Sequence, residues 1–251
     1  MDSCFVLEDF TALMSDKRAE LIHMARTAEQ AERYEDMCSF MKALVESTSP
    51  RVLDVEERNL LSVAYKFVIG TRRASLRTLD AEQESKDGQG KLNDEYKRQI
   101  EMELIGVCND ALDLLEKLIE DNQEENEARI FYLKMTADYY RYLAESVKSD
   151  KSYPEKTLEF YRRAHALAEK KLDATHPIRL GLVLNFSVCY YEILGERKQA
   201  CELAKAAFDS AISQLDTLKE AEYKDSTLIM QLLRDNLTLW TSTENEENEE
   251  E

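Results

Sequence analysis

Glycine and proline are scarce in this chain: its 251 residues contain six Gly and three Pro. A β-sandwich or barrel of this length needs turn residues about every 8–12 residues. Helical periodicity, in contrast, appears along nearly the whole chain. The sequence therefore predicts an all-α fold of about nine antiparallel helices, joined by mostly short loops.

Local signals indicate where several helices begin and end. Asp54 and Glu57 form a capping pair before a long amphipathic segment. Pro154 and Pro177 suit first helical positions, and Gly195 suits the position just beyond a helix end. We expect helices over about residues 54–79, 93–120, 128–147, 197–215 and 225–240, with two shorter helices before residue 54.

The sequence divides into three parts. Residues 1–17 form an N-terminal extension, residues 18–240 a helical domain, and residues 241–251 an acidic tail. Six of the eight residues 244–251 are Glu, so this tail buries too little apolar surface to offset its chain entropy, and we expect it to be disordered. Gly88 and Gly90 mark a mobile loop inside the domain.

The charge of the chain excludes several classes of partner. The formal net charge of −18 disfavours nucleic acid and anionic membranes. Neither a signal peptide nor a run of about 20 apolar residues is present, so we expect no membrane span. The five cysteines show no C-x-x-C spacing and are expected to be reduced and mostly buried, as in a cytosolic protein.

Catalytic and cofactor-binding patterns are missing. The three histidines are far apart in sequence, and none belongs to a metal-ligand motif such as HExxH. GxSxG, GxxxxGK[ST] and GxGxxG are absent as well. We therefore predict a protein that is not an enzyme, with no catalytic residue, no metal and no cofactor.

A basic stripe interrupts this acidic chain. Residues 58–77, RNLLSVAYKFVIGTRRASLR, contain no acidic residue. On a helix, Lys66, Arg73 and Arg77 fall within about 20° of one another, beside apolar positions such as Phe67 and Val68. Aligned cations repel, so an anion between them would offset the cost. Phosphate is the best candidate because planar guanidinium groups match its oxygens.

A second cluster lies in the segment DYYRYLAE at residues 138–145. On a helix, Asp138 and Glu145 lie on the same side as Arg141. One interpretation is a ladder of ion pairs within the helix, each worth about 0.2–0.5 kcal/mol. The other is that the acids hold the Arg141 guanidinium in place while Tyr142 offers a hydroxyl donor beside it. Taken alone, the segment favours the first interpretation; considered together with the basic stripe of Lys66, Arg73 and Arg77, the second gains ground.

Two helices near the C-terminus combine apolar stripes with amides. Leucine stripes are ordinarily core. A buried amide without a partner is costly, however, whereas an amide can bond both the N–H and the C=O of an extended peptide. We therefore expect a polar edge that binds peptide backbone beside an apolar wall. The residues are Leu184, Asn185, Val188, Glu192, Leu228, Ile229, Leu232, Asn236, Leu239 and Trp240.

Five stretches together resemble the 14-3-3 family, in the family's order. They are AEQAERYEDM (28–37), RNLLSVAYKFVIGTRRASLR (58–77), DYYRYLAE (138–145), THPIRLGLVLNFSVCYYEIL (175–194) and YKDSTLIMQLLRDNLTLW (223–240).

The resemblance implies nine antiparallel helices that form an amphipathic groove, and dimerisation through the N-terminal helices. It also implies that phosphoserine or phosphothreonine in an extended client segment binds in that groove. Lys66, Arg73, Arg141 and Tyr142 match the phosphate-binding set, and Arg77 and Lys134 match its basic surround. Asn185 and Asn236 match the amides that bond the client backbone, and Leu184, Val188, Leu228, Ile229 and Leu232 match the apolar wall, with Glu192 and Trp240 beside it.

The dimer interface departs from the family pattern. The resemblance implies an ion pair between Arg33 and Glu103 of two subunits, which this chain keeps. A second pair would join Asp36 to position 99, where the family often has Lys and this chain has Gln99. We therefore expect a weakened homodimer, or a heterodimer with a paralogue. Ser75 and Tyr96 match further interface positions, Thr27 replaces a position that is often apolar, and Leu76 replaces a Trp.

The sequence is interpreted as a cytoplasmic adaptor, with the nucleus as a second compartment, that binds phosphorylated client proteins. The alternative is a phosphate-independent helical scaffold of the tetratricopeptide kind, which would bind the termini of client peptides. A phosphate-ester hydrolase is a more distant alternative, because the chain lacks metal ligands and a nucleophile–base pair.

Overall fold

The regular secondary structure is entirely helical in the residues that the structure describes. A computed structural model describes residues 3–83, 90–148, 150–218 and 220–249. These residues form nine α-helices, a π-helical turn and a 3-10 turn, with no strand among them. The predicted all-α class is confirmed. The chain splits into two compact units, Met1–Asn122 and Gln123–Glu251.

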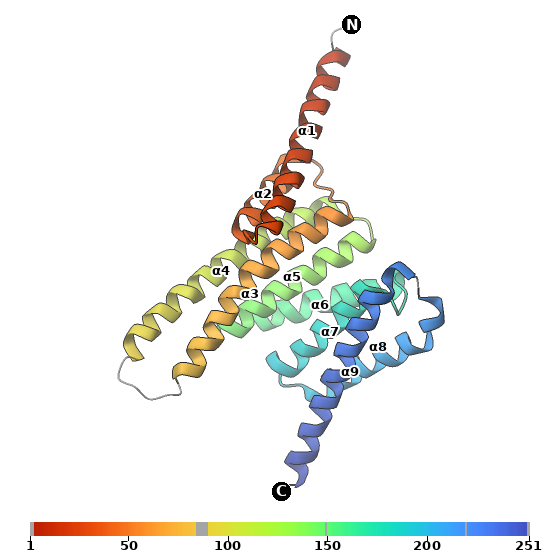
Figure 1. The fold of residues 1–251 in the computed structure, drawn as a ribbon. Coiled ribbons are helices and arrows are strands. Elements are labelled where there is room, and N and C mark those ends of the chain that lie inside the picture. Colours follow the sequence, from red (N-terminus) through yellow and green to blue (C-terminus); the bar gives the residue numbers. More distant parts are fainter. Residues whose placement is uncertain (1–2, 84–89, 149, 219, 250–251) are drawn as a thin grey trace. The chain divides into compact units, whose positions relative to one another are not determined.

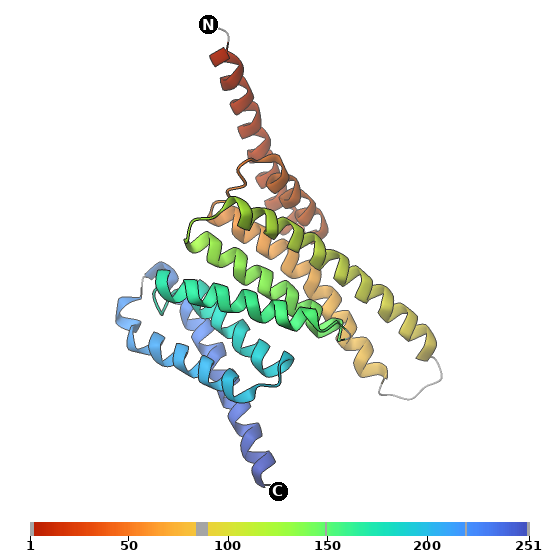
Figure 2. The same ribbon diagram turned by 180° about the vertical axis from the view of Figure 1, so that it is seen from behind.

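Unit 1 is built from four long helices that pack in sequence order, α1 on α2, α2 on α3 and α3 on α4. The last two lie side by side and run in opposite directions (Figure 1 and Figure 2). Met41, Leu61 and Leu104 come from three different helices and are almost completely buried. The bounds are α1 Ser3–Gln30, α2 Tyr34–Ser47, α3 Val55–Gln83 and α4 Gly90–Asp121.

Unit 2 contains five α-helices and both turns. A buried cluster joins α7, α8 and α9 through residues such as Leu180, Ala204 and Leu233. The alanines of α8 allow the neighbouring helices to approach closely because they have no side chain beyond Cβ. The bounds are α5 Glu127–Ser146, α6 Ser152–Lys171, α7 Pro177–Val188, η1 Cys189–Ile193, α8 Arg197–Ser213, η2 Leu215–Thr217 and α9 Glu220–Glu249.

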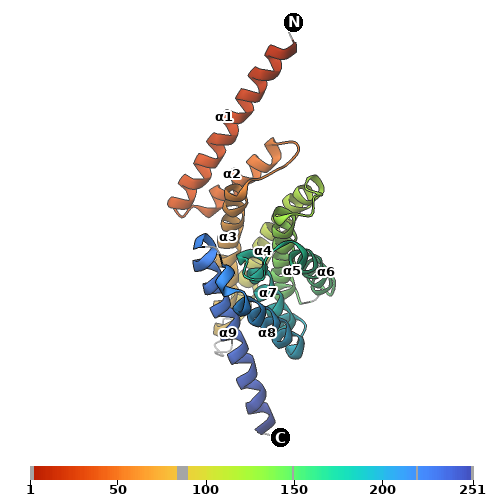
Figure 3. The same ribbon diagram turned by 90° about the vertical axis from the view of Figure 1, so that its right-hand side faces the viewer.

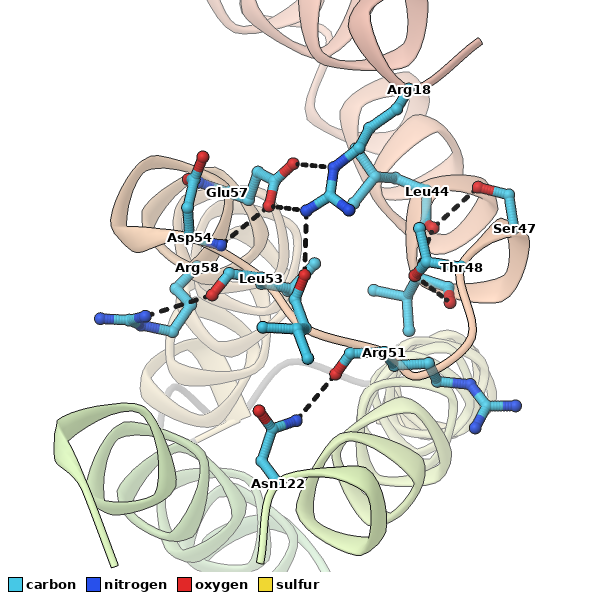
Figure 4. Close-up of polar contacts among 12 residues, drawn as sticks. Arg18, Leu44, Ser47, Thr48, Arg51, Leu53, Asp54, Glu57, Arg58 and Asn122 are labelled. Carbon is cyan, nitrogen blue, oxygen red and sulfur yellow. Dashed lines mark hydrogen bonds and ion pairs between the residues drawn. The ribbon is translucent and has the colours of Figure 1, made fainter. Parts of the chain in front are cut away.

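The capping pair at the start of α3 is confirmed. The Glu57 backbone N–H donates to Asp54 Oδ1 at 2.9 Å, and the Asp54 N–H donates to Glu57 Oε2 at 2.8 Å. The same Glu57 carboxylate receives both Arg18 Nε at 2.7 Å and Arg18 Nη2 at 2.5 Å (Figure 4). Arg18 also donates to the carbonyl of Val52 at 2.9 Å. One buried carboxylate therefore ties α1, the α2–α3 connection and the start of α3 together.

Other helix signals are confirmed except at one proline. Pro177 is the first residue of α7, and the side chain of His176 accepts a hydrogen bond from the N–H of Ile178. Gly195 has φ +69°, the left-handed conformation expected just beyond a helix end. Pro154 was predicted at a first position, but α6 begins at Ser152. The third position also lacks an intrahelical N–H partner, so a proline is tolerated there.

Helices cross both ends of the expected domain. Helix α1 runs without a break from Ser3 across the expected boundary at residue 17, and its N-terminal half extends past α2 (Figure 3). Helix α9 continues to Glu249, through most of the tail for which disorder is predicted. No Gly or Pro follows Trp240 to stop it. In the expected mobile loop, Gly88 lies outside the described residues, whereas Gly90 begins α4.

Cys38, Cys108, Cys189 and Cys201 carry free thiols. Burial raises the pKa of the Cys38, Cys108 and Cys189 thiols to about 12 in each case. These thiols therefore stay protonated and unreactive at neutral pH. Among the described residues, no helix is long and apolar enough to cross a membrane.

The neighbouring glutamates Glu56 and Glu57 allow a matched test of this anchor. Glu57→Gln removes the charge from a carboxylate that is 1% exposed and pairs with Arg18, so it should cost about 1.5–3 kcal/mol of unfolding free energy. Glu56→Gln removes the same charge from a pair with Arg26 whose side chains are about half exposed, and it should cost about 0.5 kcal/mol or less. Urea unfolding of both variants measures the difference, and equal midpoints would refute the anchoring role.

Candidate functional site

The basic stripe lies on α3 as the sequence predicts. Lys66 and Arg77 are exposed and Arg73 is half-buried. Arg72, the remaining cation of the RR pair, is held within unit 1, because its Nη1 lies 2.7 Å from Glu35 Oε1 and its Nε 3.5 Å from Glu103 Oε2. Lys66 makes no ion pair with the described residues, so its ammonium group is open to an anionic partner.

One apolar position of the stripe is not core. Phe67 is 45% exposed and stacks on Tyr34 of α2, with ring centroids 4.2 Å apart and planes 6° apart. Helical periodicity assigned Phe67 to the buried side because it adjoins Val68, which is 4% exposed. A side chain at the edge of a helix's apolar stripe can be either buried or exposed. Phe67 stays partly exposed, and its ring packs on Tyr34 of α2 rather than in the core.

The second cluster is centred on Asp138 in unit 2. Lys134 Nζ lies 2.7 Å from Asp138 Oδ2, and Arg141 Nη2 lies 3.7 Å from Asp138 Oδ1. Two further donors come from other helices: the hydroxyl of Tyr161 on α6 and the amide of Asn185 on α7, at 2.8 Å. The carboxylate therefore connects three helices. Spacing within the sequence revealed the contacts along α5, but it did not reveal Tyr161.

Arg141 is held in one orientation. It is 6% exposed, its Nε donates to the Tyr161 hydroxyl at 3.1 Å, and its guanidinium carbon lies 4.7 Å from the centre of the Tyr142 ring. A tyrosine hydroxyl, an aromatic ring and a carboxylate thus fix a cation that water scarcely reaches. The interpretation in which an acid positions Arg141 is supported by this geometry.

The electrostatics of the cluster keep Asp138 ionised. Burial by itself raises the pKa of this carboxyl, but the charges of Lys134 and Arg141 and the hydrogen bonds from Lys134 and Tyr161 outweigh it and hold the pKa below its usual value. Burial and the Asp138 carboxylate raise the pKa of Tyr161 well above its usual value, so the hydroxyl remains a donor.

The apolar stripe of α9 is exposed where the sequence predicts a peptide-binding wall. Leu228 is 59% exposed and Leu232 43%. A cavity of about 350 Å³ lies where Leu228 and Ile229 meet Lys134 and α7. The other expected wall and amide residues, Leu184, Asn185, Val188 and Asn236, are half-buried, Glu192 is exposed, and Leu239 is 62% exposed.

Trp240 occupies a different environment from the exposed leucines. It is 4% exposed and stacks on Tyr191, with ring centroids 4.7 Å apart and planes 12° apart. Its ring belongs to the buried cluster of α7, α8 and α9. We infer that Trp240 anchors the far end of the α9 stripe and supports the wall rather than forming most of its surface.

The described residues contain no group of three or more His, Cys, Asp or Glu side chains that could hold a metal ion. Chemically, the two clusters offer cations, amide donors and apolar surface. The helical fold and these two clusters together define an all-α binding protein, whose helices present charged and apolar side chains to a partner.

Comparison with known proteins identifies the family. Residues 24–241 match the 14-3-3 protein family. The chain is 53% identical over 234 residues to 14-3-3-like protein 2 of Caenorhabditis elegans, covering 91% of this chain and 94% of that protein. It is 52% identical over 234 residues to human 14-3-3 protein beta/alpha, with the same coverage, and 52% identical over 242 residues to C. elegans 14-3-3-like protein 1, covering 95% and 97%.

The chain belongs to the 14-3-3 family. It therefore has that family's general role as a phosphopeptide-binding adaptor and is not an enzyme.

Replacing Asp138 with Asn should destabilise the protein in a pH-dependent way. The depressed pKa of Asp138 means that its stabilisation is complete above the unfolded carboxyl value of about 4 and is lost as the pH falls through the lower folded value. At pH 7, Asp138→Asn should cost about 3 kcal/mol, because the buried Arg141 and the half-buried Lys134 lose their counter-charge. The difference in unfolding free energy between the variant and the native protein should become smaller as the pH is lowered.

Asp209→Asn is the matched control, since Asp209 pairs with Lys205 at 2.7 Å but its side chain is 58% exposed. Thermal unfolding from pH 7 to pH 3 measures both variants. If the loss of stability caused by Asp138→Asn does not change with pH, this account is contradicted.

Proposed function

We propose that this protein is an adaptor whose binding of client proteins depends on phosphoserine or phosphothreonine. The buried Arg141 held by Asp138 and Tyr161 is the observation that carries this proposal. Such a guanidinium is already ordered and partly stripped of water, so binding a phosphate costs it little conformational entropy. On the family resemblance, we assign Lys66, Arg73 and Tyr142 to the same phosphate-binding set.

The surrounding residues supply specificity for an extended peptide. Arg77 and Lys134 add positive charge around the phosphate. The amides of Asn185 and Asn236 bond the client backbone, while the wall formed by Leu184, Val188, Leu228, Ile229 and Leu232 binds its apolar side chains, with Glu192 and Trp240 beside it. Asn185 donates to Asp138, which leaves its carbonyl oxygen as an acceptor for a backbone N–H of the client.

The tetratricopeptide-like alternative is not favoured. A phosphate-independent scaffold has no need for a buried, oriented guanidinium in a chain of net charge −18. We place the adaptor in the cytoplasm, with access to the nucleus, where it regulates the activity, location or assembly of its clients.

We further propose that two protomers associate through the N-terminal helices, forming a homodimer or a heterodimer with a paralogue. The groups expected to pair between subunits have contacts within one protomer. Arg33 bonds Asp36, and Gln99 Nε2 donates to Glu103 Oε1 at 3.4 Å. Forming the dimer then exchanges these contacts rather than adding new ones, which favours a weak interface.

Binding should be lost when the charge of Lys66 is reversed. A phosphoserine carries about −1.5 to −2 charges, and each charge-assisted hydrogen bond contributes roughly 1.5–3 kcal/mol. Lys66→Glu should abolish binding of a phosphopeptide in a calorimetric titration and leave helicity intact, because Lys66 is exposed. Lys171→Glu, the same change at an exposed end of α6, should leave the affinity within about twofold.

The unphosphorylated form of the same peptide should bind at least tenfold more weakly to the native protein. Equal affinity for the two peptides would overturn the proposed phosphate dependence.

The dimer should respond to charge at two positions. Ser75 is exposed and is placed at the interface by the family resemblance, with Tyr96 and Glu103 as other interface positions. Ser75→Glu adds a negative charge there and should shift the equilibrium toward monomer, whereas Gln99→Lys restores a cation opposite Asp36 and should shift it toward dimer. Analytical ultracentrifugation over a concentration series is the measurement, and tight dimers at nanomolar concentration for all three proteins would show the argument wrong.

A further inference from the structure

A second pocket lies within unit 2 and shares none of its lining residues with the proposed client site. It has a volume of about 330 Å³ and is formed where α6, α7 with η1, and α8 meet. We call it the α6–α8 pocket. Its lining includes Arg162, His165, Phe186, Tyr190, Glu202 and Leu203.

The floor of the α6–α8 pocket is aromatic and held in place. Phe186 is 4% exposed and is stacked between Tyr161, at 5.2 Å and 22°, and Tyr190, at 4.8 Å and 27°. The ring of His165 meets Phe186 edge-on, with centroids 6.1 Å apart. The Tyr161 hydroxyl is itself fixed by its bond to Asp138. The floor is therefore preformed, and because both faces of Phe186 are already covered, a bound ring contacts Tyr190 and Leu203, which also line the pocket.

The rim of the pocket carries a cation without a counter-charge. Arg162 is exposed and makes no hydrogen bond or ion pair with any residue that the structure describes. Its neighbour Arg163, in contrast, pairs with Glu159 at 3.2 Å and lies 4.9 Å from the centre of the Phe160 ring. An arginine left unpaired is notable in a chain with 51 acidic and 33 basic residues, where carboxylates are abundant.

The other charges around the rim do not cancel Arg162. Glu202 lies 3.8 Å from Lys198, so this pair is close to neutral. Gln199 also lines the pocket, and its amide makes no hydrogen bond with the described residues, which leaves it as a further donor. The pocket therefore combines an aromatic floor with a net positive, unsatisfied rim.

We propose that the α6–α8 pocket binds a small aromatic carboxylate, with its ring against Tyr190 and Leu203 and its carboxylate on the Arg162 guanidinium. The volume lies near the lower end of the roughly 300–1,000 Å³ of small-molecule sites, which suits one ring system with a short acidic arm. The guanidinium fork matches a carboxylate with two parallel hydrogen bonds.

His165 should make this binding dependent on pH. Burial lowers the pKa of its imidazole, Glu169 partly opposes this, and Arg179 adds to it. The charged groups that face it are Arg162 and Glu169 on α6, Arg179 on α7 and Glu202 on α8. The imidazole is therefore neutral at pH 7 and gains a proton only below its usual range, so affinity for the carboxylate should rise as the pH is lowered from 7 toward 5.5.

Titration of the full-length protein with indole-3-acetate tests the proposal, with the methyl NMR signals of Leu203 as the local readout. The neutral analogue indole-3-acetamide has the same ring and nearly the same shape. Indole-3-acetate should shift the Leu203 signals and bind about tenfold or more tightly than the amide. Arg162→Gln should remove that preference, whereas Arg163→Gln should keep it.

Binding of a phosphopeptide to Arg162→Gln should match that of the native protein, which separates failure of this proposal from failure of the proposed adaptor function. No shift of Leu203, or equal binding of the acid and the amide, would overturn the assignment. Loss of the preference in Arg163→Gln to the same extent as in Arg162→Gln would also overturn it, because the effect would then be a general one of surface charge.

Discussion

The ionised carboxylate of Asp138 is the interaction on which the second unit depends. It neutralises part of the charge of Lys134 and Arg141, and it accepts hydrogen bonds from Tyr161 and Asn185. These partners come from α5, α6 and α7, so one buried group fixes three helices. A buried arginine without it would face the full cost of desolvation. Asp138 therefore both stabilises the fold and orients the cation that we assign to phosphate binding.

Asp138 also connects the proposed phosphate-binding arginine with the α6–α8 pocket, through Tyr161. Tyr161 places its hydroxyl on Asp138 and its ring on Phe186, so the ordered floor of the α6–α8 pocket and the ordered guanidinium of Arg141 share one side chain. In unit 1, Glu57 has a comparable role, because it caps α3 and holds Arg18 of α1. In both units a nearly buried acid organises cations, and the surplus acids remain at the surface.

Much of the fold follows from the sequence because helix signals are local. The Asp54–Glu57 pair, Pro177 and Gly195 each act within one turn of the backbone, and the structure has them where they were expected. The sequence-based expectations differ from the structure where no local signal sets a helix end or the exposure of a side chain. The start of α6 lies two residues before Pro154, and α9 extends past Trp240 because no breaker stops it. Phe67 remains 45% exposed although the Tyr34 ring of α2 stacks on it.

The sequence by itself determined the helical class, the family, and which cations lie on one face of α3, because each depends on residue type and spacing along the chain. Only the tertiary structure decided which polar groups meet across helices. Tyr161 lies 23 residues from Asp138, and Asn185 lies 47 residues from it, so no helical period connects them. Their meeting depends on how α6 and α7 pack against α5, and the same packing creates the pocket beside Arg162.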